Sequence, residues 1–568
     1  MKKATKNIKN NKNTGNSVNP GNVLPSNRIL VTAIAACGFA AAIGSGLWTT
    51  NFQVPDDDIN RTFKGTDFGN FLAMHHAMYA DDFDMVEKYS GLLSNTQIKS
   101  VQTNRALSLF VAGKIDDSAG FLEKDTSVSA QIAYAAYLIK NGDWDSVYKR
   151  FRNNNSQILA PIRIWAAVAA GKSAEALRFI DSIPGNDSWR SFIHGQVYAV
   201  TGKTERARQQ FLQIPADFLN LNDYLYLMAF YQSGGFDSDA DELRILFTER
   251  PGGLYALNYK EYGNFGDLSK VPANLRFALI QSVSHSPVLA SSSISLLLLR
   301  MAEVADEGLV RNSDPLNYYM GAFFYNSGNY DKANEFFNKI GTDSMYQPFI
   351  LLKDAEKAGN FNKMRRLLTA AIDKNPLFMP AILKLVDKNL QKGRKNDALK
   401  VVNRALKTPN LTDMGRAFLL TLRARVYRQS GDLHAADADI TLAFDLSPRD
   451  TGVLTEQAQI WAESGQNLDE AYQIAMILLK KYPSDISAWD TLAMIVWKKE
   501  GLDSAILILQ KISKVAQTNS QLFEHLGDMY IESGDVQKAH DAYTRGLELS
   551  DDGQTSESVL KKKIRKSR

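Results

Sequence analysis

Residues 417–450 read AFLLTLRARVYRQSGDLHAADADITLAFDLSPRD, and the same 34-residue pattern returns three more times further along the chain. Each copy places large apolar residues three and four positions apart, which puts them on one face of a helix. A glycine such as Gly431 ends this helix, because glycine takes the left-handed conformation at little cost. A second helix follows, and in two copies it ends at a proline, Pro448 or Pro483. Residues 417–550 therefore predict four helical hairpins, each of which needs its neighbour to bury its apolar face.

The four copies share positions whose roles are mechanical. A small residue stands where the two helices approach closely, and large apolar residues stand on the face that the next copy covers. This pattern resembles the tetratricopeptide repeat (TPR) family, whose consensus has the same period. A generic helical bundle is the alternative, which four copies in phase disfavour. The resemblance implies an all-α, right-handed helical solenoid. The residues that carry it include Leu420, Ala424, Tyr427, Ala436, Trp461, Ala471, Trp489, Ala493, Leu526, Gly527, Tyr530 and Ala539.

Weaker copies of the pattern extend toward the N-terminus. Residues 67–251 predict a degenerate TPR-like array, and residues 314–550 predict a second array that includes the four clear copies. Between them, residues 252–313 predict an irregular helical insert, in which the run ISLLLLRM is too short to cross a bilayer and predicts a buried helix. The arrays together give about thirteen hairpins. Residues 551–568 form a basic C-terminal tail, where a helix beginning at Glu557 would cap the solenoid.

The N-terminal region differs in composition from the repeats. Residues 1–28 are rich in lysine and asparagine and lack apolar periodicity, which predicts a disordered basic tail. Residues 29–48 contain no charge, and residues 49–66 form a polar linker that includes three successive aspartates. Basic residues before an apolar segment and acidic residues after it favour a cytoplasmic N-terminus and a body on the other side of the membrane.

Three interpretations of residues 29–48 remain open. An uncleaved signal anchor fits the length, which is near the minimum for a membrane span. A cleaved signal peptide fits the small residues within 40–46. A lipoprotein signal fits Cys37, the single cysteine of the chain, because the residues IAA before it resemble a bacterial lipobox and make it a candidate lipidation site. All three place the body on the periplasmic side of a bacterial cell envelope, and a single cysteine leaves the fold without an intrachain disulfide.

The formal net charge of +4 is unevenly distributed. Residues 1–48 carry six basic groups and no acidic group, and residues 561–568 carry six more basic groups. The rest of the chain has an excess of eight acidic groups. Nucleic-acid-binding proteins concentrate positive charge on the folded domain, whereas this sequence carries it on the tails. We therefore expect no nucleic-acid partner.

The sequence contains little that indicates catalysis. The strings GKS at 171–173 and GKT at 202–204 look like parts of phosphate-binding loops, but the glycine that a P-loop requires five residues earlier is absent. Both strings fall at expected turns between helices, where a glycine ends the first helix. The seven histidines are scattered and lack metal-ligand spacing. We expect no enzyme, no metal site and no cofactor.

The inner groove of the solenoid is the expected binding surface. In TPR proteins the first helix of each repeat lines this groove, and the corresponding positions here hold an aromatic and apolar strip that runs into two arginines. Such a strip suits an extended partner segment with an apolar part and an acidic part. The alternative is that several of these side chains pack between adjacent repeats. The lysine and asparagine clamp of chaperone-binding repeats is absent. The candidate groove residues are Tyr318, Tyr325, Tyr346, Phe349, Leu383, Phe418, Arg425 and Arg428.

Taken together, these features predict a membrane-tethered, extracytoplasmic scaffold that mediates protein–protein interaction. The sequence resembles proteobacterial envelope TPR proteins most over residues 417–550. That resemblance implies, for some relatives, an outer-membrane lipoprotein that acts as an adaptor for a carboxyl-terminal processing protease. One alternative is a protein that binds the cell wall or a polysaccharide, and another is an enzyme or accessory domain whose site the sequence does not reveal.

Overall fold

A computed structural model describes most of the 568-residue chain from Asp67 onward. The chain divides into two compact units, Met1–Asn70 and Phe71–Arg568, and the helices described below lie in the second, apart from the first four residues of α3. The predictions for residues 1–28, 29–48 and 49–66, including Cys37, fall outside the described residues. The described ranges are 67–79, 82–93, 99–184, 186–249, 253–256, 265–286, 292–305, 313–514, 519–550 and 557–567.

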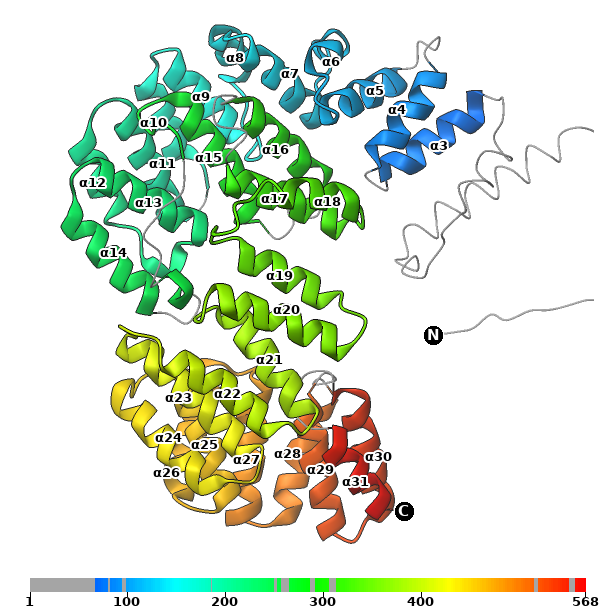
Figure 1. Cartoon of the computed structure of the whole chain (residues 1–568), viewed down its shortest axis with the longest axis vertical. Coiled ribbons are helices and arrows are strands. Elements are labelled where there is room, and N and C mark those ends of the chain that lie inside the picture. The colour runs from blue at the N-terminus through cyan, green and yellow to red at the C-terminus, as the bar shows by residue number, and fades with distance from the viewer. Residues whose placement is uncertain are drawn as a thin grey trace, which may run out of the picture. The chain divides into compact units, whose positions relative to one another are not determined.

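The first part of the second unit is a row of helical hairpins (Figure 1). From α5 to α14, each odd-numbered helix packs against the even-numbered helix that follows it. Capping side chains fix where several helices begin; the Asp143 carboxylate, for example, accepts a hydrogen bond from the Ser146 backbone N–H at 3.0 Å. The helices are α3 (Asp67–Tyr79), α4 (Phe83–Leu92), α5 (Lys99–Val111), α6 (Ile115–Leu122), α7 (Val128–Lys140), α8 (Trp144–Phe151), α9 (Ala160–Ala169), α10 (Ser173–Ser182), α11 (Asp187–Val200), α12 (Thr204–Phe211), α13 (Leu221–Ser233) and α14 (Asp237–Glu249), with a short 3₁₀ helix η1 (Ala216–Phe218) before α13.

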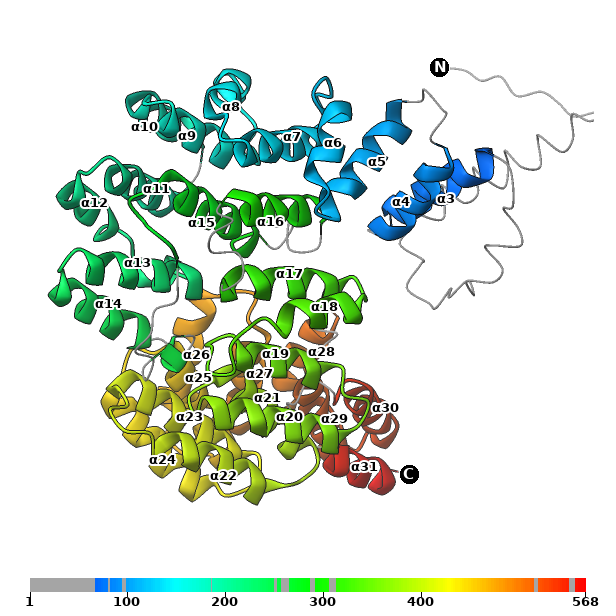
Figure 2. The ribbon, with the colours of Figure 1, turned by 45° about the horizontal axis from the view of Figure 1, so that its top comes forward.

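The predicted irregular insert contains a further hairpin. Its helices are α15 (Val271–Ser284) and α16 (Ser293–Ala305), which pack on each other, and the 3₁₀ helix η2 (Leu254–Ala256) precedes them. The apolar run within 294–301 lies in α16, and Leu296 to Leu299 are buried, as the sequence predicted. Helix α15 packs against α9, and α16 packs against α5 and α7. The hairpin therefore covers the first helices of repeats that lie far earlier in the chain (Figure 2).

The remaining helices continue the hairpin pattern to the end of the chain, again with each odd-numbered helix packed against the next. All regular elements among the described residues are helical, which confirms the predicted all-α class. The helices are α17 (Asp314–Asn326), α18 (Tyr330–Phe337), α19 (Gln347–Glu356), α20 (Phe361–Lys374), α21 (Met379–Gln391), α22 (Lys395–Leu406), α23 (Asp413–Arg428), α24 (Leu433–Leu446), α25 (Thr451–Ser464), α26 (Leu468–Lys481), α27 (Ile486–Lys499), α28 (Leu502–Ser513), α29 (Ser520–Glu532), α30 (Val536–Glu548) and the terminal helix α31 (Glu557–Lys566).

Three distant hairpins share one packing device. A Cβ atom added at Gly195, Gly321 or Gly527 would lie 2.4 Å from a ring carbon of the aromatic residue sixteen positions later, on the second helix of the same hairpin. These rings belong to Phe211, Phe337 and Tyr543. The missing side chain lets the two helices approach, and the ring fills the space between them. The glycine of each pair stands at the position where the sequence pattern requires a small residue between the two helices.

The GKS and GKT strings serve as turns. Gly171 lies between α9 and α10 with a φ of 72°, and Gly202 lies between α11 and α12 with a φ of 73°. L-residues with side chains rarely adopt this left-handed conformation, so glycine is favoured at both turns. The helices that follow begin without a side-chain cap at Lys172 or Lys203. The interpretation of both strings as structural elements is therefore supported by their backbone geometry.

Contacts between distant segments connect the repeats beyond nearest neighbours. Helix α14 packs against α23, and a Cβ at Gly415 would lie 2.5 Å from Leu254 Cδ2. Helix α31 packs against α30, and its first residue, Glu557, forms an ion pair with Lys392 at the end of α21, 3.1 Å from Nζ to Oε1. Helix α31 occupies the segment where a cap helix was predicted, and it joins two parts of the chain that are 165 residues apart.

Across the described ranges, we find no helix that combines the length and the apolar character needed to span a membrane.

Candidate aromatic binding pocket

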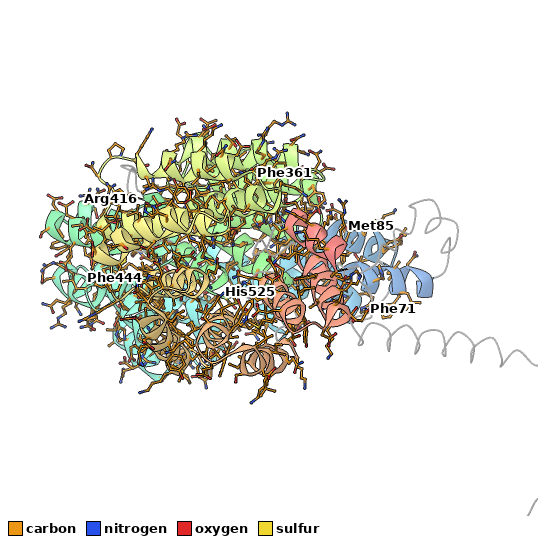
Figure 3. All side chains as sticks on the ribbon, turned by 90° about the horizontal axis from the view of Figure 1, so that it is seen from below. Phe71, Met85, Phe361, Arg416, Phe444 and His525 are labelled. Atoms are coloured by element: carbon orange, nitrogen blue, oxygen red, sulfur yellow. The ribbon has the colours of Figure 1, made fainter. Side chains whose placement is uncertain are left out.

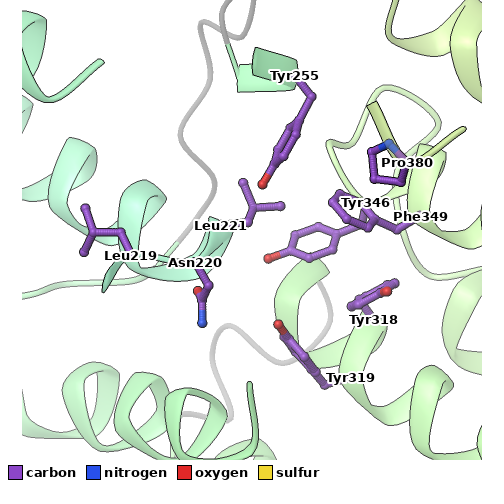
Figure 4. Close-up of a pocket in the computed structure, with 9 residues that line it drawn as sticks. All are labelled: Leu219, Asn220, Leu221, Tyr255, Tyr318, Tyr319, Tyr346, Phe349 and Pro380. Atoms are coloured by element: carbon purple, nitrogen blue, oxygen red, sulfur yellow. The ribbon is translucent and has the colours of Figure 1, made fainter. Parts of the chain in front are cut away.

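A cavity of about 460 Å³ opens between the first helices of several hairpins (Figure 4). Its wall comes from the start of α13, from η2, from α17, from the start of α19 and from the first turn of α21. These segments lie far apart in the sequence and are brought together by the packing of the hairpins. The lining residues are Leu219, Asn220, Leu221, Tyr255, Tyr318, Tyr319, Tyr346, Phe349 and Pro380.

One buried amide holds two of the tyrosines in place. Asn222 Nδ2 donates a hydrogen bond to the Tyr319 hydroxyl at 3.0 Å, and the Tyr346 hydroxyl donates to Asn222 Oδ1. Asn222 is 1% exposed, so both of its polar atoms depend on these partners. The amide therefore fixes the orientation of tyrosines on α17 and at the start of α19 relative to α13.

The α13 side of the pocket is itself anchored. Asn220 caps α13, and its side chain and that of Asp223 bond to each other's backbone N–H in a capping box. Asn220 Nδ2 also donates to Ser284 Oγ at 2.9 Å, and Asp223 Oδ1 accepts from Gln281 Nε2 at 2.7 Å. Since Gln281 and Ser284 belong to α15, the predicted insert supports the floor of the pocket.

The opposite side is a cluster of aromatic rings. The Tyr318 ring lies 5.0 Å from the Tyr346 ring and 6.0 Å from the Phe349 ring, measured between centroids. Tyr255 meets Phe349 edge-on at 5.6 Å, and Asn375 Nδ2 holds the Tyr255 backbone carbonyl at 2.6 Å. In Figure 4 the hydroxyl ends of Tyr255, Tyr319 and Tyr346 point toward the space that the residues enclose. These edge-on and tilted arrangements are favourable for aromatic pairs and make the wall rigid.

The described residues that line the pocket include no charged side chain. Burial raises the pKa of Tyr318 and of Tyr319 well above the ordinary value of tyrosine, and it does the same for Tyr346. Tyrosine hydroxyls are protonated at neutral pH in any case, and the raised pKa keeps these hydroxyls protonated, and able to donate hydrogen bonds, at alkaline pH as well. We find no hydrogen-bond partner for the Tyr318 hydroxyl among the described residues. The arrangement suits an uncharged, largely apolar ligand that offers a hydrogen-bond acceptor.

No group of three or more histidine, cysteine, aspartate or glutamate side chains that could hold a metal ion occurs within the described ranges.

Three of the eight groove residues predicted from the sequence meet in this pocket: Tyr318, Tyr346 and Phe349. Tyr346 is 3% exposed, and it contributes to the wall from a buried position. Tyr325 lies on the same helix as Tyr318 but outside the pocket, where its hydroxyl donates to the Lys353 carbonyl and burial raises its pKa to about 12. Leu383 is partly buried and packs against the main core.

The two arginines predicted at one end of the groove are paired with carboxylates of the array in the structure. Phe418 is partly buried against the core. Arg425 pairs with Asp387, 2.6 Å from Nη2 to Oδ1. Burial opposes the charged form of Arg428, but Glu456 and Glu463 outweigh this effect and raise its pKa. Both arginines link first helices of neighbouring repeats, because carboxylates on those repeats lie within ion-pair distance of the guanidinium groups. The prediction that Arg428 faces a partner is therefore wrong, since its side chain is only 3% exposed.

Other pocket residues were missed from the sequence. Tyr255 falls in the segment predicted to be a loop, and Asn220 and Leu221 lie 97 or more residues from the α17 tyrosines. Tyr319 is adjacent to the predicted residue Tyr318, but it does not occupy a repeat position that was expected to line the groove. The one signal in the sequence is the unusual density of tyrosine between 318 and 346.

Comparison with known proteins was made at the level of sequence and of structure. No protein-family model and no curated protein matches the sequence. Solved structures that match include a tetratricopeptide repeat protein from Parabacteroides merdae, 14% identical over 45% of this chain and 98% of that chain, with a TM-score of 0.35. Yeast Tom70 is 14% identical over 88% of this chain and 95% of its own, with a TM-score of 0.28. MamA from Desulfovibrio magneticus is 17% identical over 30% and 94%, with a TM-score of 0.22.

Proposed function

We propose that this tetratricopeptide repeat protein is a scaffold that binds an extended segment of a partner protein in the aromatic pocket. The observation that carries the proposal is an uncharged cavity walled by Tyr255, Tyr318, Tyr346 and Phe349, on the side of the array formed by the first helices. Preformed, mostly apolar cavities with a few fixed polar groups are the usual form of a binding site. The aromatic rings already lie against one another, so little ordering accompanies binding.

The ligand segment is extended and apolar, with proline or an aromatic side chain as its anchor. Aromatic-lined grooves accept such segments because the flat rings contact them without requiring a charge. The Tyr318 hydroxyl would donate to a backbone carbonyl of the segment. We expect an acidic side chain of the segment to add no affinity. Arg425 and Arg428, which lie outside the pocket, already form ion pairs with carboxylates of the array.

We further propose that the scaffold is held at the periplasmic face of a bacterial membrane through residues 29–48. Support comes from the sequence: an uncharged stretch with basic residues before it and acidic residues after it. A role as adaptor for an envelope protease or an assembly complex is the specific form of this proposal. We propose no catalytic activity; the described residues that line the pocket include no nucleophile–base pair.

Site-specific photocrosslinking tests the pocket. p-Benzoylphenylalanine is introduced into the full-length protein in cells at position 318, and at position 330 as a control, since Tyr330 is exposed and lies outside the pocket. We expect a discrete crosslinked polypeptide from position 318 that is absent from position 330. A synthetic peptide that matches the crosslinked segment then competes for binding to the purified protein.

The same experiment separates the alternatives. If the pocket binds a cell-wall polymer, position 318 crosslinks to material that muramidase or glycosidase digestion shifts and protease digestion leaves unchanged. That outcome, or equal crosslinking from positions 318 and 330, contradicts the proposal. Replacing Tyr318 with phenylalanine removes only the hydroxyl, and we expect it to weaken binding of the identified peptide by roughly fivefold, the effect of one hydrogen bond.

For the membrane tether, Cys37→Ala releases a lipoprotein from membranes and leaves a signal anchor in place.

A further inference from the structure

Positive charge in the described body is concentrated in two segments. Residues 357–407 carry thirteen basic and three acidic residues, and residues 557–568 carry six basic residues and one acidic residue. The rest of the chain from residue 67 onward has sixteen more acidic than basic residues. From the sequence, these C-terminal cations were expected in a basic tail with a cap helix beginning at Glu557. The structure shows helix α31 over Glu557–Lys566, and this helix packs against α30.

The fold joins the two segments into one surface. Gln391 Nε2 donates to the Ser550 carbonyl, and Lys392 pairs with Glu557 at the start of α31. A Cβ at Gly393 would lie 3.7 Å from Ser558 Oγ, so the turn between α21 and α22 touches the first turn of α31. On the other side of this turn, the Arg394 guanidinium lies 4.9 Å from the centroid of the Phe361 ring at the start of α20. The α21–α22 turn therefore connects the start of α20 to the start of α31.

We call this surface the basic strip. It comprises the first two turns of α20, the α21–α22 turn and α31, and Figure 3 labels Phe361 and shows long side chains that project into solvent on its side of the molecule. At 1.5 Å per helical residue, the first two turns of α20 are about 11 Å long and α31 is about 15 Å long. The cations of the strip that are exposed and have no ion-pair partner among the described residues are Lys363, Arg365, Arg366, Lys562, Arg565 and Lys566.

We infer that the basic strip binds a short acidic segment of a partner polypeptide. Unpaired arginine and lysine side chains attract carboxylates, and arginine can bind them with two parallel hydrogen bonds. An extended peptide covers about 3.3 Å per residue, so about five residues match the length of α31. This surface is formed by second helices and by α31, so it is separate from the aromatic pocket and does not depend on the function proposed for it.

The surroundings of the strip favour a short acidic segment over other anionic partners. A nucleic acid duplex or a lipid surface extends beyond the strip and meets the acidic remainder of the body, which repels it. Membrane-binding helices also need apolar side chains to insert, and Val559 is the one exposed large apolar residue recorded on α20, α22 or α31. Single-stranded nucleic acid needs aromatic side chains for base stacking. The described parts of these three helices expose none, because Phe361 is partly covered by Arg394.

Fluorescence anisotropy on the full-length protein tests the inference. The probe is a labelled twelve-residue peptide of alternating glutamate and serine, and its control replaces each glutamate with glutamine. We expect the acidic peptide to bind and the neutral peptide not to bind. Raising the salt concentration from 50 to 300 mM should weaken binding roughly tenfold, because the attraction is between exposed charges.

Two charge-reversal variants test whether the strip is a single surface. Arg365→Glu/Arg366→Glu changes α20, and Arg565→Glu/Lys566→Glu changes α31; each should weaken acidic-peptide binding roughly tenfold. The matched control is Lys172→Glu/Arg206→Glu, which reverses two exposed cations of the first hairpins and alters the net charge equally. Because folding could be affected, the glutamine versions of both strip variants are measured as well, with circular dichroism to verify the helical content.

The outcomes are distinguishable. Loss of peptide binding in both strip variants, with binding retained in the control, supports the inference. Equal loss of peptide binding in the control variant attributes binding to net charge and overturns the inference. Loss of binding in only one strip variant shows that α20 and α31 do not form a single binding surface. A twenty-base-pair duplex, or vesicles with phosphatidylserine, that bind while the acidic peptide does not would assign the strip to nucleic acid or to membrane instead. Failure of the aromatic pocket to crosslink leaves this result unchanged, since the two surfaces share no residue.

Discussion

Arg428 and Glu456 form a buried ion pair between the first helices of two successive hairpins, α23 and α25. Arg428 Nε lies 2.6 Å from Glu456 Oε1, and the side chains are 3% and 6% exposed. Glu463, on the same helix as Glu456, accepts from a second guanidinium nitrogen. Each charge is removed from water, and only the partner compensates for that loss. The pair therefore ties the register of one repeat to the next and is unavailable to a ligand.

Removing the arginine should destabilise this part of the array. Arg428→Met leaves Glu456 and Glu463 without their partner, and we expect a loss of about 3–5 kcal/mol in the free energy of unfolding, as for other broken buried pairs. Urea denaturation followed by circular dichroism measures the loss. Since a long repeat array need not unfold in one step, the comparison uses the transition that shifts in the variant.

The matched control is Arg404→Met. Arg404 forms a similar pair with Asp373, but both side chains are about half exposed, so water screens the charges and little stability is lost. If the two variants lose similar amounts of stability, the argument from burial is wrong.

The stability of the C-terminal repeats should fall as the pH rises toward 10. Burial alone lowers the pKa of His525, but Asp490, whose Oδ2 lies 2.9 Å from His525 Nδ1, together with Glu524 and Glu463, outweighs burial and raises it to about 9. The folded pKa thus exceeds the ordinary value of 6.5. The contribution of this pair is fully present below about pH 6.5 and is lost as the pH rises through about 9.

Thermal unfolding between pH 6 and pH 10 measures this dependence. His525→Gln keeps a hydrogen-bond donor but no titrating charge, so its melting temperature should be lower at pH 6 and should change less between pH 6.5 and pH 9. A wild-type profile that is flat over this interval, or a variant profile with the same slope as wild type, would contradict the assigned pKa.

Adding one methyl group at Gly527 should destabilise the last hairpin. The new Cβ would lie 2.4 Å from Tyr543 Cε1, and the ring is held by a hydrogen bond from its hydroxyl to Asp528 Oδ1 at 2.8 Å. Overpacking of this kind costs about 1–3 kcal/mol, so Gly527→Ala should lower the denaturation midpoint.

Two further variants separate overpacking from the general effect of glycine replacement. Gly120→Ala, on α6, meets nothing within 4 Å, and we expect it to raise stability slightly because alanine favours helix. Combining Gly527→Ala with Tyr543→Leu should recover part of the loss. Destabilisation by Gly120→Ala, or no recovery in the double variant, would count against the packing argument.

The amide at the floor of the aromatic pocket should matter for both stability and binding. Asn222→Leu leaves the Tyr346 hydroxyl buried without its acceptor and frees Tyr319, which we expect to cost about 1–3 kcal/mol. Because both rings lose their fixed orientation, the affinity for the peptide identified by crosslinking should fall as well. Asn396→Leu, at an exposed position on α22, is the control and should change neither quantity.

The sequence by itself was sufficient for the hairpins. Apolar spacing, turn glycines such as Gly171 and small residues such as Gly321 act within one repeat, so their consequences can be read over a few tens of residues. The repeat pattern also singled out Tyr318, Tyr346 and Phe349, and the structure brings these three side chains to one cavity; their role in binding stays a prediction. These features rest on local periodicity, which determines helices and their immediate partners.

The tertiary structure decided which residues meet across many repeats. Asn222 reaches tyrosines 97 and 124 residues away, and Lys392 reaches Glu557 across 165 residues. Such contacts depend on the small rotation between successive hairpins, summed over several repeats, and a 34-residue pattern does not encode that sum. For the same reason the sequence placed Arg428 in an open groove, and it predicted a helix from Glu557 without showing that this helix reaches Lys392. Residues 417–450 determine how each hairpin is built; the packing of the whole array determines which of its surfaces remain free to bind.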